Sequence, residues 1–338
     1  MRSSRSWLST GIAIAVVLAA CTAAERDYHH ELYAFGTYVS VSFYAVTEEK
    51  NQEGLAGLET LFGEVDDNWY PWAPGELQRI NKAIAAGEAI AVSPRLQSLI
   101  LAAADYELRS RGRFNAGLGR LTELWHFHDI ANPPAVLPDA EILAALLHAA
   151  PALASLGWQR GKLTGHNREV MIDLGGIAKG AILEDCRDLL RTIGIGNAII
   201  NIGGDLVVIG QVGERAAHIG IRSPLIDAPV AGLEIADGEA VFTSGSYERF
   251  LEIDGTRYSH ILDPTTGFPV EHTVSVTVVS DDPVRADAAA TALMVGGADD
   301  FNDLVEALQL DYALLIDAGG DTRLTPGMRE RLEWLDTP

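Results

Sequence analysis

The sequence predicts an α+β fold in which mixed or antiparallel sheets carry packed helices. Helical spacing of apolar residues dominates long early stretches such as 47–67, whereas most of 198–280 reads as short strands. Asp254-Gly255 is the strongest hairpin signal in the chain. Strands in runs, with helices grouped between them, indicate α+β layers rather than a doubly wound sheet. No repeat or linker divides the chain, so we expect one large domain or two tightly joined subdomains.

The N-terminus has the pattern of a targeting signal. Arg2 and Arg5 precede an apolar run that ends in Leu18-Ala19-Ala20-Cys21. This ending resembles the bacterial lipoprotein box, whose cysteine is lipidated and becomes the new N-terminus; an ordinary secretory peptide is the alternative. The expected segments are a signal peptide, 1–20, a flexible tether, 21–30, and a folded domain, 31–338.

Charge and cysteine content limit the partners. The formal net charge of −22 argues against nucleic acid and against broad attachment to anionic lipid. With Cys21 lipidated, Cys186 has no disulfide partner. We expect an extracytoplasmic protein anchored by lipid to a bacterial membrane. Thr22 is not the aspartate that often marks inner-membrane retention, and the periplasmic side of the inner membrane is favoured over the outer membrane.

The first half of the chain is expected to be mostly helical. Alternation over 38–44 predicts a half-buried strand. An aromatic cluster at 69–72 is followed by a short helix, and Ser93 is expected to cap a long one. The loop 112–119 comes next. The expected helices are 47–67, 76–82, 93–111, 121–125 and 139–147.

The second half alternates between a few helices and many strands. The expected strands are 169–172, 198–201, 206–209, 217–221, 233–235, 240–243, 247–253, 256–262 and 274–280. The expected helices are 181–190, 285–295 and 298–308.

The stretch Asp173-Leu174-Gly175-Gly176-Ile177-Ala178-Lys179-Gly180 is suited to phosphate. Glycines allow a ligand to approach the backbone, and the first N–H groups of a helix point at anions. The alternative is an ordinary strand-to-helix turn with a solvated lysine. It is not a Walker loop, because no Gly-Lys-Ser/Thr follows. Gly194-Ile195-Gly196 is not a dinucleotide fingerprint, because the third glycine is missing.

Two later segments add candidate chemistry. Asp287 and Thr291 lie four residues apart, so on a helix their oxygens share a face and could bind Mg²⁺. The alternative is that Asp287 caps the helix and Thr291 bonds back to its own turn. His260 is expected on a strand before the tight turn at Asp263-Pro264, where a structural role is the alternative to catalysis.

Together these segments resemble the ApbE lipoprotein family, the FAD:protein FMN transferases. The matches occur in the family's order and cover nearly the whole mature chain. The matching segments are Phe35-Gly36-Thr37, Asp173 to Gly180, Asn201-Ile202-Gly203-Gly204-Asp205, Thr243-Ser244-Gly245-Ser246-Tyr247-Glu248-Arg249, His260 to Pro269, and Ala286-Asp287 to Thr291.

The resemblance implies an ApbE-type, T-fold-like domain and a specific site. Asp173 and Lys179 would contact FAD, and the carbonyl of Gly176 would join Asp287 and Thr291 around Mg²⁺. His260 would be the catalytic residue. The other residues implied to line FAD are Phe35, Trp72, Arg113, Phe114, Asn115 and Leu262.

The chain departs from the family pattern at three places. Phe35 stands where methionine is usual, and the cluster around Trp72 is about one residue shorter than the motif. Ala290 replaces a second aspartate that some members carry, so one metal ion is expected rather than two.

The activity implied is Mg²⁺-dependent transfer of FMN from FAD to a threonine or serine hydroxyl of an acceptor protein, with release of AMP. The implied acceptors are extracytoplasmic flavoprotein subunits of membrane redox complexes. Two alternatives stay open: a pyrophosphatase that splits FAD into FMN and AMP, and a non-catalytic lipoprotein that binds FAD.

Overall fold

The computed structural model describes residues 24–129, 131–224 and 228–335. The predicted signal peptide and Cys21 lie outside the described residues, and among those described no helix is long and apolar enough to cross a membrane.

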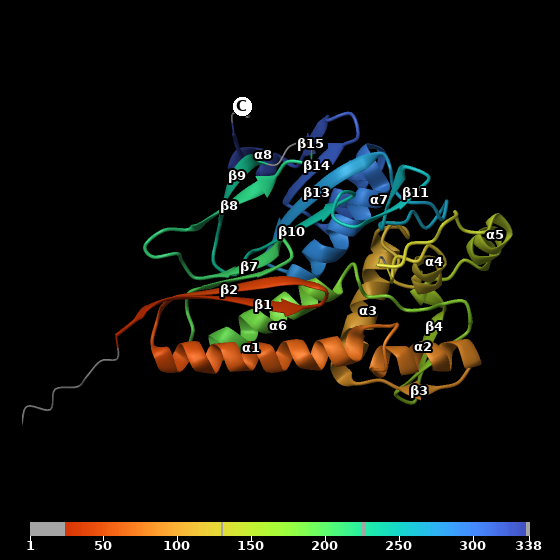
Figure 1. The fold of residues 1–338 in the computed structure, drawn as a ribbon, viewed down its shortest axis with the longest axis horizontal. Helices are drawn as coiled ribbons and strands as arrows, with labels where there is room; N and C mark the ends of the chain where they lie inside the picture. Colours follow the sequence, from red (N-terminus) through yellow and green to blue (C-terminus); the bar gives the residue numbers. More distant parts are fainter. Residues whose placement is uncertain (1–23, 130, 225–227, 336–338) are drawn as a thin grey trace, which may run out of the picture.

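An eight-stranded antiparallel sheet forms the centre of the fold (Figure 1), in the order β1-β2-β6-β7-β10-β13-β14-β15. Its strands are β1 (Arg26–Ala34), β2 (Thr37–Val46), β6 (Ala198–Ile202), β7 (Asp205–Ile209), β10 (Ala240–Gly245), β13 (Thr273–Ser280), β14 (Tyr312–Asp317) and β15 (Thr322–Leu324). The predicted α+β class is therefore confirmed.

The helices are spread along the whole chain. They are α1 (Glu48–Trp69), α2 (Glu76–Ala86), α3 (Pro94–Arg109), α4 (Gly119–Leu124), α5 (Ala140–Ala149), the 3₁₀ turn η1 (Leu153–Ser155), α6 (Ala178–Thr192), α7 (Pro283–Leu308) and α8 (Pro326–Arg331).

Three small sheets complete the fold. They consist of β3 (Ile90–Ala91), β5 (Lys162–Gly165) and β4 (Leu156–Gln159); β16 (Glu333–Trp334), β9 (Pro229–Ile235) and β8 (Ala217–Arg222); and the hairpin of β11 (Phe250–Ile253) and β12 (Thr256–Ser259).

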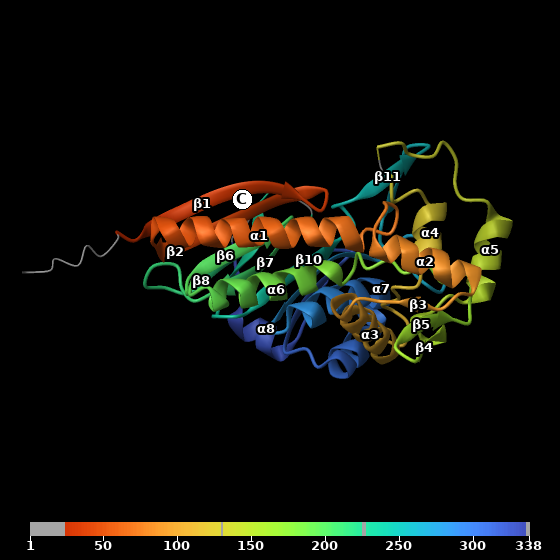
Figure 2. The same ribbon diagram turned by 90° about the horizontal axis from the view of Figure 1, so that it is seen from below.

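Both faces of the central sheet are covered, which explains why all of β7 is buried. Val207 and Ile209 face a core shared with α1, α6 and α7, whereas Leu206 and Val208 face a second core shared with β8, β9 and α8. Successive side chains of a strand point to opposite faces, so a continuous apolar run fits a sheet between two layers. Figure 2 shows α1 and α6 lying across one face.

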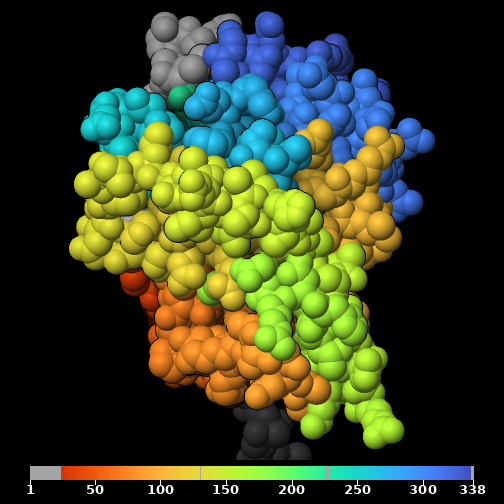
Figure 3. Space-filling model, turned by 90° about the vertical axis from the view of Figure 1, so that its right-hand side faces the viewer, coloured from red at the N-terminus to blue at the C-terminus, as the bar shows by residue number. Residues whose placement is uncertain are grey.

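A third, smaller apolar cluster joins α4 and α5 to the β11–β12 hairpin. Figure 3 shows the corresponding yellow and cyan parts of the chain side by side on the surface. Trp125 is fully buried at the centre of this cluster, and its indole N–H donates to the carbonyl of Gly267 at 2.8 Å. The cluster therefore ties the loop after His260 to the helices that follow residue 112.

Several expectations about single elements need correction. Residues 26–30, expected in the tether, belong to β1. Residues 169–172 do not form a strand: only Met171 makes an isolated bridge, to Leu118. The two helices expected at 285–295 and 298–308 are confirmed: both lie within α7, and Gly297, at a φ of 60°, interrupts the helical conformation between them. His260 follows β12 instead of lying on it.

Candidate active site

The site is built where the N-terminus of α6 meets α7. A Cβ atom at Gly180 would lie 2.5 Å from the carbonyl oxygen of Pro283, so only glycine permits this close approach. Asp287 Oδ2 accepts a hydrogen bond from the Gly180 N–H at 2.8 Å. The first N–H groups of a helix favour negative charge, and here they receive a carboxylate from the neighbouring helix.

Gly176 brings a second pair of elements to the same place. A Cβ atom there would lie 3.0 Å from Thr291 Oγ1 and 3.3 Å from the ring of Phe114. Thr291 stands one helical turn after Asp287, as its spacing predicts. The three residues expected around a metal ion, Gly176, Asp287 and Thr291, therefore belong to one site.

Lys179 pairs with Asp205, a residue that the sequence reasoning did not place in the site. The other carboxylate oxygen of Asp205 accepts from the Thr243 N–H at 2.8 Å, and its side chain is only 3% exposed. Burial acts to lower the pKa of Lys179, but the carboxylates of Asp205 and Asp287 outweigh it and raise that pKa. Lys179 is therefore a charged, partnered side chain rather than a solvated one.

Asp287 is a buried carboxylate with an unfavourable environment for its charge. Burial raises the pKa of Asp287, and the negative charge of Asp205 adds to this, while Lys179 and the N–H groups of α6 act in the opposite direction. A buried carboxylate of this kind gains from a nearby cation. With the Thr291 hydroxyl beside it, the donors are the oxygen types that Mg²⁺ prefers.

Asp173 ends the segment that leads into α6. Its Oδ1 accepts from the Gly175 N–H at 3.0 Å and its Oδ2 from the Thr122 hydroxyl at 3.2 Å. Burial raises the pKa of Asp173 despite these bonds. The segment is held by Asn81, whose amide exchanges hydrogen bonds of 2.7 and 2.9 Å with the backbone of Ile172.

His260 is held by the main chain of Arg249. The carbonyl oxygen of Arg249 lies 3.1 Å from His260 Nδ1 and also accepts from the His260 N–H. Because a carbonyl can only accept, Nδ1 carries the proton of the neutral ring and Nε2 keeps the free lone pair. Burial, and then the positive charge of Arg249, lowers the pKa of His260 to about 4.

Two aromatic candidates, Phe35 and Trp72, pack against other aromatic rings. Phe35 forms the turn between β1 and β2 at a φ of 56°, with its ring edge-on to Phe62 at 5.4 Å. Trp72 stacks on His128 at 5.4 Å and meets Tyr70 edge-on. The Tyr70 hydroxyl donates to the carbonyl of His128 at 3.2 Å, so Tyr70, Trp72 and His128 form one aromatic group.

The remaining candidates are bound to the scaffold. Arg113 donates from Nε and from a terminal nitrogen to one carboxylate oxygen of Asp300, both at 2.7 Å. The amide of Asn115 bonds to the backbone of Pro151 and Gly117. Leu262 forms a backbone bridge to Pro269 at the base of the turn.

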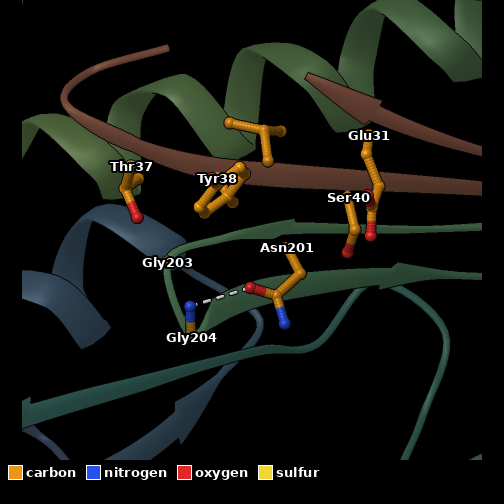
Figure 4. A pocket seen from close by; sticks show the side chains of 8 residues that line it. Glu31, Thr37, Tyr38, Ser40, Asn201, Gly203 and Gly204 are labelled. Carbon is orange, nitrogen blue, oxygen red and sulfur yellow. Dashed lines mark hydrogen bonds between the residues drawn. The ribbon is translucent and has the colours of Figure 1, made fainter. Parts of the chain in front are cut away.

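A surface groove of about 310 Å³ lies next to the turn between β6 and β7 (Figure 4). It is lined by residues of β1, β2 and the β6–β7 turn, including Thr37, Tyr38 and Asn201. The Asn201 side chain accepts from the Gly204 N–H at 2.8 Å and so fixes the turn that precedes Asp205.

Within the described residues, no group of three or more histidine, cysteine, aspartate or glutamate side chains has the arrangement of a metal site. The candidate site formed by Asp287, Thr291 and Gly176 would not be found by such a search, because only one of its three donors is a carboxylate side chain.

Comparison with known proteins identifies the family. The family model described as "ApbE family" matches residues 35–325. The chain belongs to the ApbE family.

Relatives in the ApbE family share both sequence and fold with this chain. A protein of Rhodobacter capsulatus named "FAD:protein FMN transferase" is 37% identical over 96% of this chain, which spans 62% of that protein. One of Vibrio cholerae with the same name is 31% identical, over 92% of this chain and 94% of the relative. The crystal structure of the ApbE protein of Thermotoga maritima matches with a TM-score of 0.82 at 28% identity, covering 90% of this chain and 99% of that one.

The site of this ApbE-family chain contains two charged residues that lie in the motifs named above but were given no role from sequence. Asp205 ends the Asn201 to Asp205 motif, and Arg249 ends the Thr243 to Arg249 motif. A charged residue at the end of a glycine-containing motif could have indicated that each of them belongs to the site. Asn81 and Thr122 lie outside every quoted motif, and only the fold brings them to Asp173.

Proposed function

We propose that this chain is an Mg²⁺-dependent FAD:protein FMN transferase. The observation that carries the proposal is the meeting of the α6 N-terminus with Asp287 and Thr291 across Gly176. A glycine-lined helix start suits phosphate, and oxygen donors beside it suit the cation that accompanies phosphate. The names of the relatives support the same activity.

The donor set fits one Mg²⁺ ion. The Asp287 carboxylate, the Thr291 hydroxyl and the Gly176 carbonyl would hold it, leaving positions for water and for substrate phosphates. When bound, the ion would neutralise charge on the pyrophosphate of FAD.

The residues of the chain would bind and orient the two substrates. Phe35, Trp72 and Phe114 would surround the flavin ring, and Asp173 and Lys179 would contact FAD near the start of α6. Arg113, Asn115 and Leu262 would also line FAD, each held in place through the bonds described above.

His260 would act as the general base. Its Nε2 would take the proton of the acceptor hydroxyl while that oxygen forms a bond to the FMN phosphorus. The bond from this phosphorus to the bridging oxygen would break, and AMP would leave with that oxygen. The product would be FMN joined to the acceptor by a phosphoester.

The proposed setting is extracytoplasmic. A lipid anchor at Cys21 would hold the enzyme at a bacterial membrane, on the periplasmic side of the inner membrane. The proposed acceptors are flavoprotein subunits of membrane redox complexes.

The test incubates the purified chain with FAD, Mg²⁺ and recombinant flavoprotein subunits that expose threonine or serine. Chromatography would measure AMP, and intact-mass spectrometry would measure FMN on the acceptor. We expect both AMP release and FMN transfer when Mg²⁺ is present, and neither after Mg²⁺ has been chelated. AMP released equally without an acceptor would indicate a pyrophosphatase. FAD binding without AMP, unaffected by chelation, would indicate a non-catalytic binder.

A further inference from the structure

Arg249 is an exposed arginine whose side chain has no assigned task. One of its terminal nitrogens lies 3.5 Å from the position that a Cβ atom of Gly36 would occupy, so the guanidinium reaches the turn that carries Phe35. Its own carbonyl holds His260. The side chain therefore extends between the predicted flavin-lining turn and the candidate base.

The charges around the site leave Arg249 without a partner. Asp205 already pairs with Lys179, and Asp287 bonds to the start of α6. The guanidinium of Arg249 forms no ion pair or hydrogen bond with any residue that the structure describes. Its positive charge nevertheless acts on Asp173, Lys179 and His260, so it lies within electrostatic reach of all three.

An unpaired guanidinium between these groups fits an anion. Arginine presents a planar set of donors that matches two oxygens of a phosphate, and it keeps its charge at any working pH. Both phosphates of FAD carry negative charge. The surrounding carboxylates would repel them, so a cation that is not already bound to a carboxylate is needed as well as Lys179.

We propose that the Arg249 guanidinium binds the pyrophosphate of FAD and stabilises the negative charge that develops on the departing AMP phosphate. This rests on the proposed function. While the acceptor oxygen bonds to the FMN phosphorus, the bridging oxygen takes the electron pair of the broken bond, and Arg249 donates hydrogen bonds to that phosphate. The guanidinium gains and loses no proton.

The experiment compares Arg249→Ala and Arg249→Lys with the control Arg257→Ala. Arg257 is exposed on β12 in the same hairpin region, where its guanidinium lies 4.5 Å from the centre of the Phe250 ring and 3.9 Å from Glu252. Arg249→Ala keeps the carbonyl that orients His260. Isothermal titration would measure three probes: FAD, AMP and riboflavin, which has the flavin ring but no phosphate.

We expect Arg249→Ala to weaken AMP and FAD binding about tenfold or more and to leave riboflavin binding unchanged. Transfer measured in a single turnover should fall by about 10²–10³-fold, the usual cost of removing one such donor. Arg249→Lys should recover part of both losses, and Arg257→Ala should match the unmodified chain. Equal losses for AMP and riboflavin, or no loss for AMP, would overturn the proposal.

The pH profile provides a second measurement. Arg249 and Lys179 are the charged groups that act on His260, and both lower its pKa. Arg249→Ala should therefore move the acid limb of the transfer rate to higher pH, and an unmoved limb would contradict the assigned position of the guanidinium. If the unmodified chain transfers no FMN, the proposed function fails, whereas the AMP and riboflavin titrations still test Arg249.

Discussion

His260 is a neutral imidazole over the whole physiological range, because burial and the charge of Arg249 lower its pKa to about 4. This value lies well below the ordinary histidine pKa of about 6.5. A base with so low a pKa is weak, but it is never lost to protonation near pH 7.

We predict that His260→Asn lowers FMN transfer by about 10²–10⁴-fold while FAD binds almost normally. Only neutral imidazole accepts a proton, so the wild-type rate should stay level through neutral pH and fall as the pH drops through about 4. Transfer rate against pH and FAD affinity, measured on one variant, would check this. A parallel loss of melting temperature and FAD affinity, without a change in the acid limb, would make His260 structural.

Asp287 offers the sharpest test of the metal assignment. Asp287→Ala should abolish transfer with little effect on the fold, because the site has few protein ligands and loses its one carboxylate. The matched control is Asp299→Ala, an exposed aspartate on the same helix. Titrating Mg²⁺ against transfer rate would measure the effect, and normal turnover of Asp287→Ala at modest Mg²⁺ would remove it from the metal site.

Lys179 carries a more complex expectation now that its partner is known. Lys179→Ala should weaken FAD more than it slows the chemical step, but it also leaves the buried carboxylate of Asp205 without its ion pair. The double variant with Asp205→Asn separates the two effects. If FAD affinity returns in the double variant, the loss came from Asp205; if it stays low, Lys179 contacts FAD.

At the scale of elements, Asn81 of α2 replaces a missing strand neighbour. Its amide gives Ile172 the two hydrogen bonds that a paired strand would provide. We predict that Asn81→Ala costs about 2–3 kcal/mol of folding free energy, because two buried backbone groups lose their partners. Chemical denaturation would measure the change in the free energy of unfolding. A change under about 0.5 kcal/mol would show that other contacts hold the segment.

The same segment explains one error of sequence reasoning. Residues 169–172 are apolar and β-branched, as a strand would be, but their hydrogen bonds go to Asn81 and to a loop. Local composition cannot reveal that a side chain has taken the place of a strand. The opposite error occurred at β1, where polar and charged residues on a half-exposed edge strand hide the alternation.

Features that depend on one stretch of chain were predicted, whereas features that join distant elements were not. The break between helices 285–295 and 298–308 was predicted correctly, because Gly297 itself adopts a non-helical conformation between them. The spacing of Asp287 and Thr291 was predicted correctly because it depends on one helix alone. The pairing of Lys179 with Asp205 was not, because it joins a helix to a strand.

At the scale of the whole molecule, an ion pair adds to the apolar packing that holds α8 against the sheet. Arg331 bonds to both carboxylate oxygens of Glu239 at 2.7 Å, and both side chains are mostly buried. Burial alone would raise the pKa of Glu239, but the guanidinium outweighs it and lowers that pKa. The pair therefore contributes stability above the unfolded value of about 4.3 and loses it as the pH falls through the lower folded value.

We predict that Glu239→Gln costs about 2 kcal/mol at pH 7, within the range of about 1.5–3 kcal/mol that is typical of a hydrogen bond to a charged group. The cost should be much smaller at an acidic pH below the lowered pKa of the wild-type carboxylate. Thermal unfolding at both pH values would measure the difference. A penalty that is equal at the two pH values would contradict an electrostatic role for the pair.

The strand order of the central sheet has a consequence for biogenesis. The β1–β2 hairpin pairs next with β6, so that Val41 meets Ile200 although α1 to α6 intervene in the chain. Until β6 has left the ribosome, Val39, Val41 and Phe43 expose an apolar ribbon with an open edge, the kind of surface on which chains aggregate. A nascent chain shorter than residue 202 should therefore depend on chaperones, however early its hairpin is synthesised.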